Sequence, residues 1–556
     1  MRSKSGLLNA FFSTQPGLLA RVSLCFMFPF QRFIEQSTMT SAANLSSDVR
    51  PPSMDDNSAR TPLASRRSGE PKPGFFKRFG LIFAFIALAL ICLAPEQPGL
   101  TVAGQRMIGI MVFAVITWSS TAVSFPVSGG LIMALIAVLI GLSPKPDGTG
   151  IIGTTAGMKT ALTGFSSPAF CLVGAALFLA AAMMRTGLDK RIALFTLSKI
   201  GATPNRVVVG IILCGFILSF FVPSTTARVA CLVPIVIGMI RAFGLQIKSA
   251  FGAMLMITVA QVDSVWNVGI KTAAAQNMVA VNFIRDITGQ EISWLDWFIA
   301  AAPFAALMSV VLYFVVTKLL GGSVEPFQGG EAAVRKQLAD LGPMSANEWK
   351  LTIVSLILLL LWVTEKKLHP FDTTTTTVCA IAFLMLPRVG VMDWKGTVDR
   401  INWGTVLVFG VGISLGSALL STKAAQWLAN CIVTGFSLAD ASTFAVIAIM
   451  AAFLIIVHLG FASAAGLASA IIPIIIAVLG ELQDPNVNIL GMTMILQYVI
   501  SFGFILPVNA PQNMIAYSTG AFDVKTFAFT GIILTAAAYL LVLLLTATYW
   551  SWLGLA

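Results

Sequence analysis

The sequence predicts an all-α polytopic membrane protein built from two inverted-topology repeats, and three observations support this prediction. The chain has 556 residues, of which 57% are hydrophobic and only 11% charged, whereas a soluble domain carries about 25% charged residues. Its apolar runs are about 20 residues long, as in membrane-spanning helices, and lack the alternation of β-barrel strands. Two sequence motifs also recur at nearly constant spacing.

A basic, polar segment precedes the first apolar run. Residues 1–78 are rich in Ser, Pro and Arg without lasting periodicity, so a disordered tail is expected. The positive-inside rule places this tail and the N-terminus in the cytoplasm. Its apolar stretch 18–30 lacks the clean cleavage site of a signal peptide. Met39 and Met54 are alternative starts of the natural chain.

The remaining chain divides into a first transmembrane repeat at 79–320, a polar connecting loop at 321–348 and a second transmembrane repeat at 349–556. Several apolar segments are short or interrupted by Pro and Gly, so about eleven crossings with broken helices and re-entrant hairpins are expected. The segments lie near 79–95, 105–122, 127–143, 165–184, 205–222, 229–244, 250–262, 294–320, 349–363, 373–388, 403–420, 440–458, 463–480, 489–508 and 526–550.

An internal repeat relates the two halves. The motif AAQNMVA at 274–280 returns as APQNMIA at 510–516, 236 positions later. A serine lies ten residues before a Pro-Ile pair in each half, at Ser224 and at Ser463, 239 positions apart. Two motifs in the same order at nearly one spacing indicate duplicated structural units.

Charge distribution indicates that the repeats are inverted. Segment 185–206 carries five bases, namely Arg185, Lys190, Arg191, Lys199 and Arg206. Its counterpart at 421–442 carries only Lys423. Equivalent loops therefore face opposite sides of the membrane, an architecture typical of secondary transporters with a midplane binding site.

The stretch 220–235 predicts an anion site. Pro223 favours a helix break, at which Ser224, Thr225 and Thr226 present hydroxyl groups. The next half-helix directs free N–H groups and a positive dipole end toward the break, where they attract carboxylate or sulfate oxygens. The alternative is a simple proline kink with hydroxyls bonded back to the helix.

Two further stretches are unusually polar for a membrane segment. Asp263 and Lys271 are intramembrane ionisable groups, which are usually functional or paired, here with each other as the alternative. In the mirror stretch 504–522, Pro507 and Pro511 break the helix, and amides at Asn509, Gln512 and Asn513 suit a monovalent cation or an anion.

These motifs resemble the divalent anion:sodium symporter (DASS) family of dicarboxylate and sulfate transporters. The family's Ser-Asn-Thr signature is similar to 224–226, and its L-P-V-x-T-P-P-N tip is similar to 506–513. Segments 164–194 and 401–429 also resemble family segments, so the resemblance covers 79–556. It implies substrate-binding residues Ser224, Thr225, Thr226, Asn277, Ser463, Pro511 and Asn513.

The resemblance further implies one sodium ion near each signature, as a co-substrate rather than a resident cofactor, and a homodimer. The candidate cation-site residues are Ser224, Lys271, Asp263, Ser463 and Asn509. The second signature has lost its Asn and Thr, since Ala464 and Ala465 follow Ser463. PSTTAR at 223–228 and HLGFAS at 458–463 resemble the family's exchanger branch.

The function expected from the residues and the resemblance is secondary transport of small dianions, C4 or C5 dicarboxylates first and sulfate next, coupled to sodium or protons. The alternative is sodium-independent dicarboxylate exchange, with Lys271 as a fixed substitute for one cation. A bacterial inner membrane is the expected location, with lipid and the anion as partners, and nucleic acid is not expected.

Other classes fit the composition less well. An intramembrane enzyme needs a His/Asp/Glu cluster, yet the chain has 2 histidines and few intramembrane carboxylates. No metal site or catalytic residue is therefore expected, and the 7 cysteines, none in a CxxC pair, are expected as free thiols. A channel does not need a twofold cradle of broken helices, and a sensor would normally carry an output domain.

Overall fold

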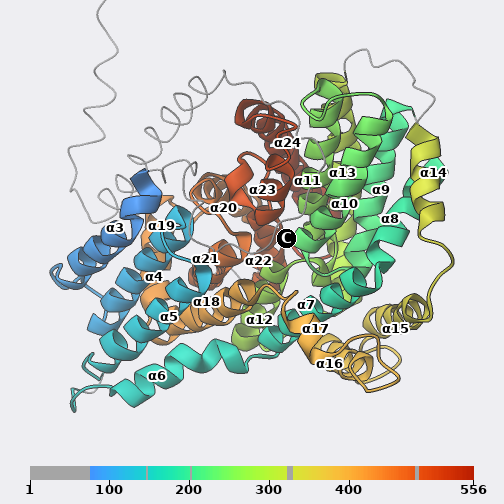
Figure 1. Cartoon of the computed structure of the whole chain (residues 1–556). Helices are drawn as coiled ribbons and strands as arrows, with labels where there is room; N and C mark the ends of the chain where they lie inside the picture. Colours follow the sequence, from blue (N-terminus) through green and yellow to red (C-terminus); the bar gives the residue numbers. More distant parts are fainter. Residues whose placement is uncertain (1–74, 146–147, 201–202, 322–329, 483–486) are drawn as a thin grey trace, which may run out of the picture. The chain divides into compact units, whose positions relative to one another are not determined.

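The computed structural model describes residues 75–145, 148–200, 203–321, 330–482 and 487–556. These residues are mostly helical, and two isolated bridges are the β-pairs found among them. Ten of the described helices are long and apolar enough to cross a membrane, and four shorter apolar helices accompany them. The prediction of an all-α polytopic membrane protein is confirmed (Figure 1).

The segment expected as the first repeat contains the helices from α3 to α13. Its helices are α3 (Phe75–Cys92), α4 (Val102–Ser120), α5 (Phe125–Leu135) with the π-helical turn η1 (Ile136–Ile140), α6 (Thr154–Leu162), the 3₁₀ turn η2 (Thr163–Ser166), α7 (Pro168–Thr186), α8 (Leu188–Ile200), α9 (Pro204–Phe221), α10 (Thr225–Ala242), α11 (Ala250–Gly269), the 3₁₀ turn η3 (Lys271–Ala273), α12 (Ala275–Thr288) and α13 (Trp294–Leu320).

The second repeat follows a connecting segment that contains α14 (Gly330–Asp340). Its helices are α15 (Ala346–Val363), α16 (Thr373–Leu384), α17 (Trp394–Val398), α18 (Trp403–Ser421), α19 (Ala424–Gly435), α20 (Thr443–His458), α21 (Ala464–Glu481), α22 (Ile489–Ile500), the 3₁₀ turn η4 (Pro507–Asn509), α23 (Pro511–Tyr517) and α24 (Val524–Leu545) with the π-helical turn η5 (Thr546–Trp550).

Three expectations about segment boundaries need correction or fall outside the structure. The connecting loop expected at 321–348 contains α14, which packs against α8 and α10 (Figure 1). The expected disordered tail lies outside the described residues except for 75–78, which form the first turn of α3. The central part of the basic segment 185–206 forms α8 (Leu188–Ile200), an amphipathic helix without a long apolar run.

Each repeat contains a pair of half-helices that meet at a break. In the first repeat α9 ends at Phe221 and α10 begins at Thr225, with Ser224 as the N-cap. In the second repeat α20 ends at His458, and Ser463 caps α21 in the same way. Each serine oxygen accepts a hydrogen bond from the backbone N–H three residues later, at 3.4 Å and 3.3 Å respectively. The helix breaks expected from the two serine motifs are confirmed.

A second broken element follows in each repeat, as α11–η3–α12 and α22–η4–α23. Extended residues at Ala274 and Ala510 separate the short 3₁₀ turn from the next helix in both cases. We call the turns η3 and η4, each with its extended residue, the first and second hairpin tips. Pro511 occupies the first helical position of α23, where a proline's missing N–H costs nothing.

Reciprocal contacts relate the two repeats. Gln276 Nε2 donates to Ser501 Oγ at 3.3 Å, and the repeat-related Gln512 Nε2 donates to Ser264 Oγ at 3.2 Å. Helix α10 packs against α23, as α21 packs against α12. The glutamines are equivalent and the serines lie one position from equivalence, so this exchange of contacts indicates a twofold relation, which is the relation that inverted-topology repeats have.

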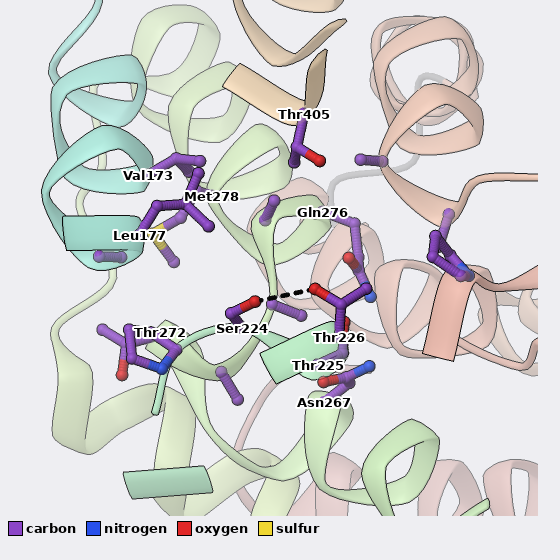
Figure 2. Close-up of a pocket in the computed structure, with 18 of the residues that line it drawn as sticks. Val173, Leu177, Ser224, Thr225, Thr226, Asn267, Thr272, Gln276, Met278 and Thr405 are labelled. Carbon is purple, nitrogen blue, oxygen red and sulfur yellow. Dashed lines mark hydrogen bonds between the residues drawn. The ribbon is translucent and has the colours of Figure 1, made fainter. Parts of the chain in front are cut away.

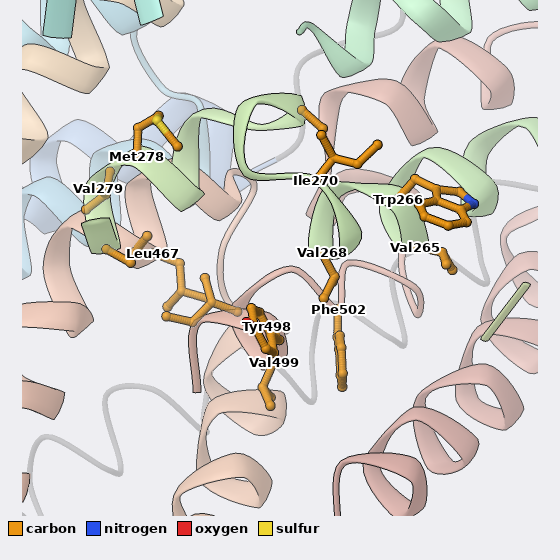
Figure 3. Close-up of a cluster of buried hydrophobic side chains, with 14 of the residues drawn as sticks. Val265, Trp266, Val268, Ile270, Met278, Val279, Leu467, Tyr498, Val499 and Phe502 are labelled. Atoms are coloured by element: carbon orange, nitrogen blue, oxygen red, sulfur yellow. The ribbon is translucent and has the colours of Figure 1, made fainter. Parts of the chain in front are cut away.

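The centre of this arrangement is closely packed. Helix α11 is buried from Phe251 to Gly269, and residues of α11 and α12 pack with residues of α21 and α22 (Figure 3). Trp266, Ile270 and Phe502 belong to this cluster. A polar side chain on such a helix cannot reach water, so it must find a partner within the protein.

Candidate functional site

A cavity lies where the helix breaks and the hairpin tips of the two repeats meet (Figure 2). Its volume of about 120 Å³ is below the roughly 300–1,000 Å³ of drug-sized pockets, so it suits a small ligand. The cavity lining includes Ser224, Thr225, Thr226, Asn267, Gln276, Ser463, Ala464, Ala465, Ser501, Gly503, Pro511 and Gln512, with Leu172, Val173, Leu177 and Met278 opposite.

Four helices begin at this cavity. The first residues of α10, α12, α21 and α23 are Thr225, Ala275, Ala464 and Pro511, and all four line it. In α10, α12 and α21 the first N–H groups have no acceptor within the helix, and together with the macrodipole they favour an anion. The short helix α23 begins with Pro511, which has no N–H. The described lining contains no Lys, Arg, His, Asp or Glu side chain. Negative charge would therefore be held by helix ends, hydroxyls and amides.

Hydroxyl groups are concentrated at the start of α10. Ser224 Oγ and Thr226 Oγ1 lie 3.1 Å apart in a hydrogen bond (Figure 2). Thr225 lies between them and also lines the cavity. Ser463 lines the same cavity from the second repeat. The two serine motifs therefore meet at one cavity.

Arg228 forms a fully buried hydrogen-bonded centre below the cavity. Its side chain has no exposed surface, and Nε lies 2.5 Å from Asp263 Oδ1. Nη1 donates to the carbonyl oxygens of Val222 at 2.8 Å and Ala273 at 3.2 Å. The guanidinium therefore joins α11, the first helix break and the first hairpin tip.

The same guanidinium orients Asn267. Arg228 Nη2 donates to Asn267 Oδ1 at 2.8 Å, and Asn267 lines the cavity. Because the amide oxygen is engaged by the guanidinium, the NH₂ group is the part of this amide left for a ligand. A ligand with carboxylate oxygens would match that donor.

Lys271 does not line the cavity. Its Nζ donates to Ile292 O at 2.7 Å and lies 3.9 Å from Glu365 Oε2. The alternative in which Lys271 pairs with Asp263 is wrong, because Asp263 is bound to Arg228. Helix α11 ends at Gly269, so the chain turns and Lys271 projects to a different side of the hairpin tip.

Two predicted ligand asparagines brace the hairpin tips. Asn277 Nδ2 donates to Asn267 O at 2.7 Å and Ile270 O at 3.2 Å. The repeat-related Asn513 Nδ2 donates to Gly503 O at 2.7 Å. Neither asparagine is part of the cavity lining. A direct contact of these residues with substrate stays a prediction.

Asn509 closes the second helix break. Its Nδ2 donates to Phe461 O at 2.9 Å and His458 O at 3.0 Å, and its Oδ1 accepts from Leu506 N at 3.1 Å. These carbonyls are the kind of ligand that a cation would need. Here a neutral carboxamide already occupies them, although Asn509 was expected as a cation ligand itself.

Several cavity residues escaped the sequence analysis. Asn267, Thr405 and the apolar residues of α7 line the cavity but were not among the predicted site residues. Arg228 and Asp263 are visible in the sequence as intramembrane charges that usually find a partner, but Lys271 lies closer to Asp263 along the chain. The apolar lining residues carry no such signal, since they resemble any lipid-facing or core residue.

The cavity reaches the protein surface beside the start of α18. Asn402, the N-cap of α18, lines the cavity and is exposed. The preceding loop carries the exposed bases Arg388, Lys395 and Arg400. Asp393 of this loop is bound to Arg185 at the end of α7, next to the basic α8. The open end therefore lies on the basic side of the protein.

Comparisons with known proteins add the following findings. A family model described as the sodium:sulfate symporter transmembrane region matches residues 76–556. A membrane protein of Cupriavidus necator is 52% identical over 485 residues, 87% of this chain and 94% of that protein. The sodium-dependent dicarboxylate transporter SdcS of Staphylococcus saprophyticus is 22% identical over 81% of this chain and 87% of its own. The chloroplastic dicarboxylate transporter 2 of Spinacia oleracea is 23% identical over 76% and 77%.

Proposed function

Because the chain belongs to the family of sodium:sulfate symporter transmembrane regions, we propose that it is a secondary transporter that carries C4 or C5 dicarboxylates through the central cavity. The observation that supports this most is the convergence of the N-termini of α10, α12 and α21 on one small cavity whose described lining has hydroxyls and amides but no ionisable side chain. Two of the relatives are named as dicarboxylate transporters. Sulfate is the second candidate substrate, as the family description suggests.

Sodium-independent exchange is the coupling mode that the geometry favours. Moving charge against the membrane potential costs about 2.3 kcal/mol per charge per 100 mV, so a dianion needs cations or a counter-substrate. Arg228 already donates to the carbonyls of Val222 and Ala273, where the first cation would bind. The guanidinium is paired with Asp263, so it fills this place without adding net charge, and it cannot be released as a sodium ion can. A cation site that is permanently filled favours obligatory exchange.

Sodium symport is the second candidate, because one relative is named a sodium-dependent dicarboxylate transporter. It would need cation ligands other than the carbonyls held by Arg228 and Asn509. Proton coupling is a third mode. The basic rim of the open cavity supports a location in the cytoplasmic membrane of a bacterium, with the cavity open to the cytoplasm.

Uptake of radiolabelled succinate into proteoliposomes tests both parts of the proposal. We expect uptake that requires internal dicarboxylate and is unchanged when external sodium is replaced by potassium. Uptake that follows a sodium gradient without internal substrate would contradict exchange but leave dicarboxylate transport standing. Failure of succinate, malate and 2-oxoglutarate to drive exchange would refute the dicarboxylate assignment, and parallel uptake of sulfate would reveal the other substrate class.

A further inference from the structure

The two halves of the cavity differ in polarity at repeat-related positions. In three pairs the first-repeat residue offers a hydroxyl or an amide, whereas the second-repeat residue offers a methyl group or no side chain. The pairs are Thr225 with Ala464, Thr226 with Ala465 and Asn267 with Gly503, and all six residues line the cavity. A ligand with two equal polar ends would therefore meet different groups at its two ends, although Ser463, Ser501 and Gln512 also give the second repeat polar side chains in the lining.

An apolar wall completes the cavity. We use this term for the lining residues Leu172, Val173 and Leu177 of α7 and Met278 of α12. Val173, Leu177 and Met278 gather on one side of the cavity (Figure 2). Val173 is 6% and Met278 3% exposed, so little of either side chain faces anything but the cavity and the core. None of these four side chains can bond the hydrogen of a hydroxyl group at ordinary strength.

The wall favours hydrocarbon over hydroxyl on the substrate. A hydroxyl directed at it would give up its hydrogen bonds to water without replacement, which is unfavourable. A methyl group directed at it would leave water and gain contacts. Each buried methylene-sized group should tighten binding about fourfold, until the cavity of about 120 Å³ is full.

We propose that the cavity selects a dicarboxylate with a short alkyl branch on its carbon chain. One carboxylate is held by the hydroxyls of α10 and the NH₂ group of Asn267. The other carboxylate relies on the backbone N–H groups at the start of α21. The branch lies against the apolar wall. This inference rests on the proposed dicarboxylate transport and specifies its substrate class.

Competition with related acids tests the preference directly. Succinate, methylsuccinate, 2,2-dimethylsuccinate and malate would be compared as inhibitors of radiolabelled succinate exchange. Thermal stabilisation of the purified protein by each acid measures binding without transport. We expect methylsuccinate to bind about fourfold more tightly than succinate, and malate more weakly than methylsuccinate. Equal or weaker binding of methylsuccinate would overturn the branch inference while leaving dicarboxylate transport intact. No stabilisation by any of these acids would overturn both.

A substitution in the wall identifies the cause of the preference. Val173→Thr keeps the shape of the side chain and adds a hydroxyl. We expect the ratio of methylsuccinate to succinate affinity to fall toward one in this variant. Cys171→Ser, on the exposed face of the same helix and outside the lining, is the matched control and should keep the parent ratio. An unchanged ratio in Val173→Thr would overturn the role assigned to the wall.

Discussion

The carbonyl oxygens at the two helix breaks are bound by different donors. In the first repeat the guanidinium of Arg228 donates to Val222 O at 2.8 Å. At the repeat-related place in the second repeat, the carboxamide of Asn509 donates to Phe461 O at 2.9 Å. The distances are nearly equal, but one donor carries a permanent positive charge and the other is neutral. Duplicated backbone geometry can therefore hold two breaks whose electrostatics differ.

The two repeats also contribute different side chains to the cavity. The half with the buried cation also has the hydroxyls of Thr225 and Thr226 and the amide of Asn267. The half with the neutral amide has Ala464, Ala465 and Gly503 at the matching positions. At these three positions the side-chain hydrogen-bond donors lie in the first repeat, where one end of an anion would be bound more firmly.

Removal of the buried cation should produce the largest effect. Arg228→Leu leaves Asp263 charged, buried and without its partner, and it frees the carbonyls of Val222 and Ala273. Breaking a buried ion pair from one side costs about 3–5 kcal/mol. We expect a large fall in thermal stability in detergent and loss of succinate exchange.

A double variant separates the charge from the packing in this experiment. Arg228→Leu combined with Asp263→Leu removes both charges, so part of the stability should return while exchange stays absent. If the double variant also regained sodium-independent exchange, the guanidinium would not be the fixed cation. The difference between the charged donor at the first helix break and the neutral donor at the second would then have no functional consequence.

Stability and exchange should be less sensitive to substitution at the second helix break, where the donor Asn509 is neutral. Asn509→Leu leaves the carbonyls of Phe461 and His458 without their donor, and a buried unsatisfied polar group costs about 1–3 kcal/mol. We expect a smaller loss of stability than in Arg228→Leu and residual exchange. Asn509→Ser, which retains a shorter donor, is the graded control. A loss equal to that of Arg228→Leu would contradict the view that charge distinguishes the two breaks.

Lys271 provides the next test, because it was the sequence-based choice for the fixed cation. Its Nζ donates to Ile292 O, and the nearby Glu365 keeps hydrogen bonds from Trp294 N and Thr373. We expect Lys271→Leu to cost about 1.5 kcal/mol and to leave the sodium dependence of uptake as in the parent. If sodium-independent exchange disappeared in Lys271→Leu and survived in Arg228→Leu, the fixed cation would be Lys271 and not Arg228.

The mistaken pairing shows which features a sequence can and cannot provide. Ser224 and Ser463 reveal both helix breaks, because proline, hydroxyl and periodicity signals are local. Asp263 lies eight residues before Lys271 and 35 after Arg228, so proximity along the chain favours the wrong partner. The correct pair depends on how α10 packs against α11. The apolar wall is likewise invisible in the sequence, because only the packing of α7 shows that Val173 faces a cavity.

Disruption of an exposed ion pair on the basic side should have the smallest effect on stability. Comparison with the buried Arg228–Asp263 pair therefore isolates the contribution of burial. Arg185 Nη2 lies 2.5 Å from Asp393 Oδ2, with side chains 32% and 60% exposed. The hydrogen bond from Arg185, together with the backbone N–H of Gly396, holds the pKa of Asp393 below its usual value. A carboxyl group whose pKa is lower in the folded state than its unfolded value of about 3.9 stabilises the fold at pH values above about 3.9. This stabilisation is lost as the pH falls through the pKa of the folded state. The stability difference between the parent and Asp393→Asn should therefore be small and constant from pH 8 to pH 5, and should shrink in high salt.

Melting temperatures across this pH range measure the stability difference, with Lys395→Gln in the same loop as the control. A loss comparable to that of Arg228→Leu, or a difference that changes between pH 8 and pH 6, would show that burial is not what separates the two arginine–aspartate pairs.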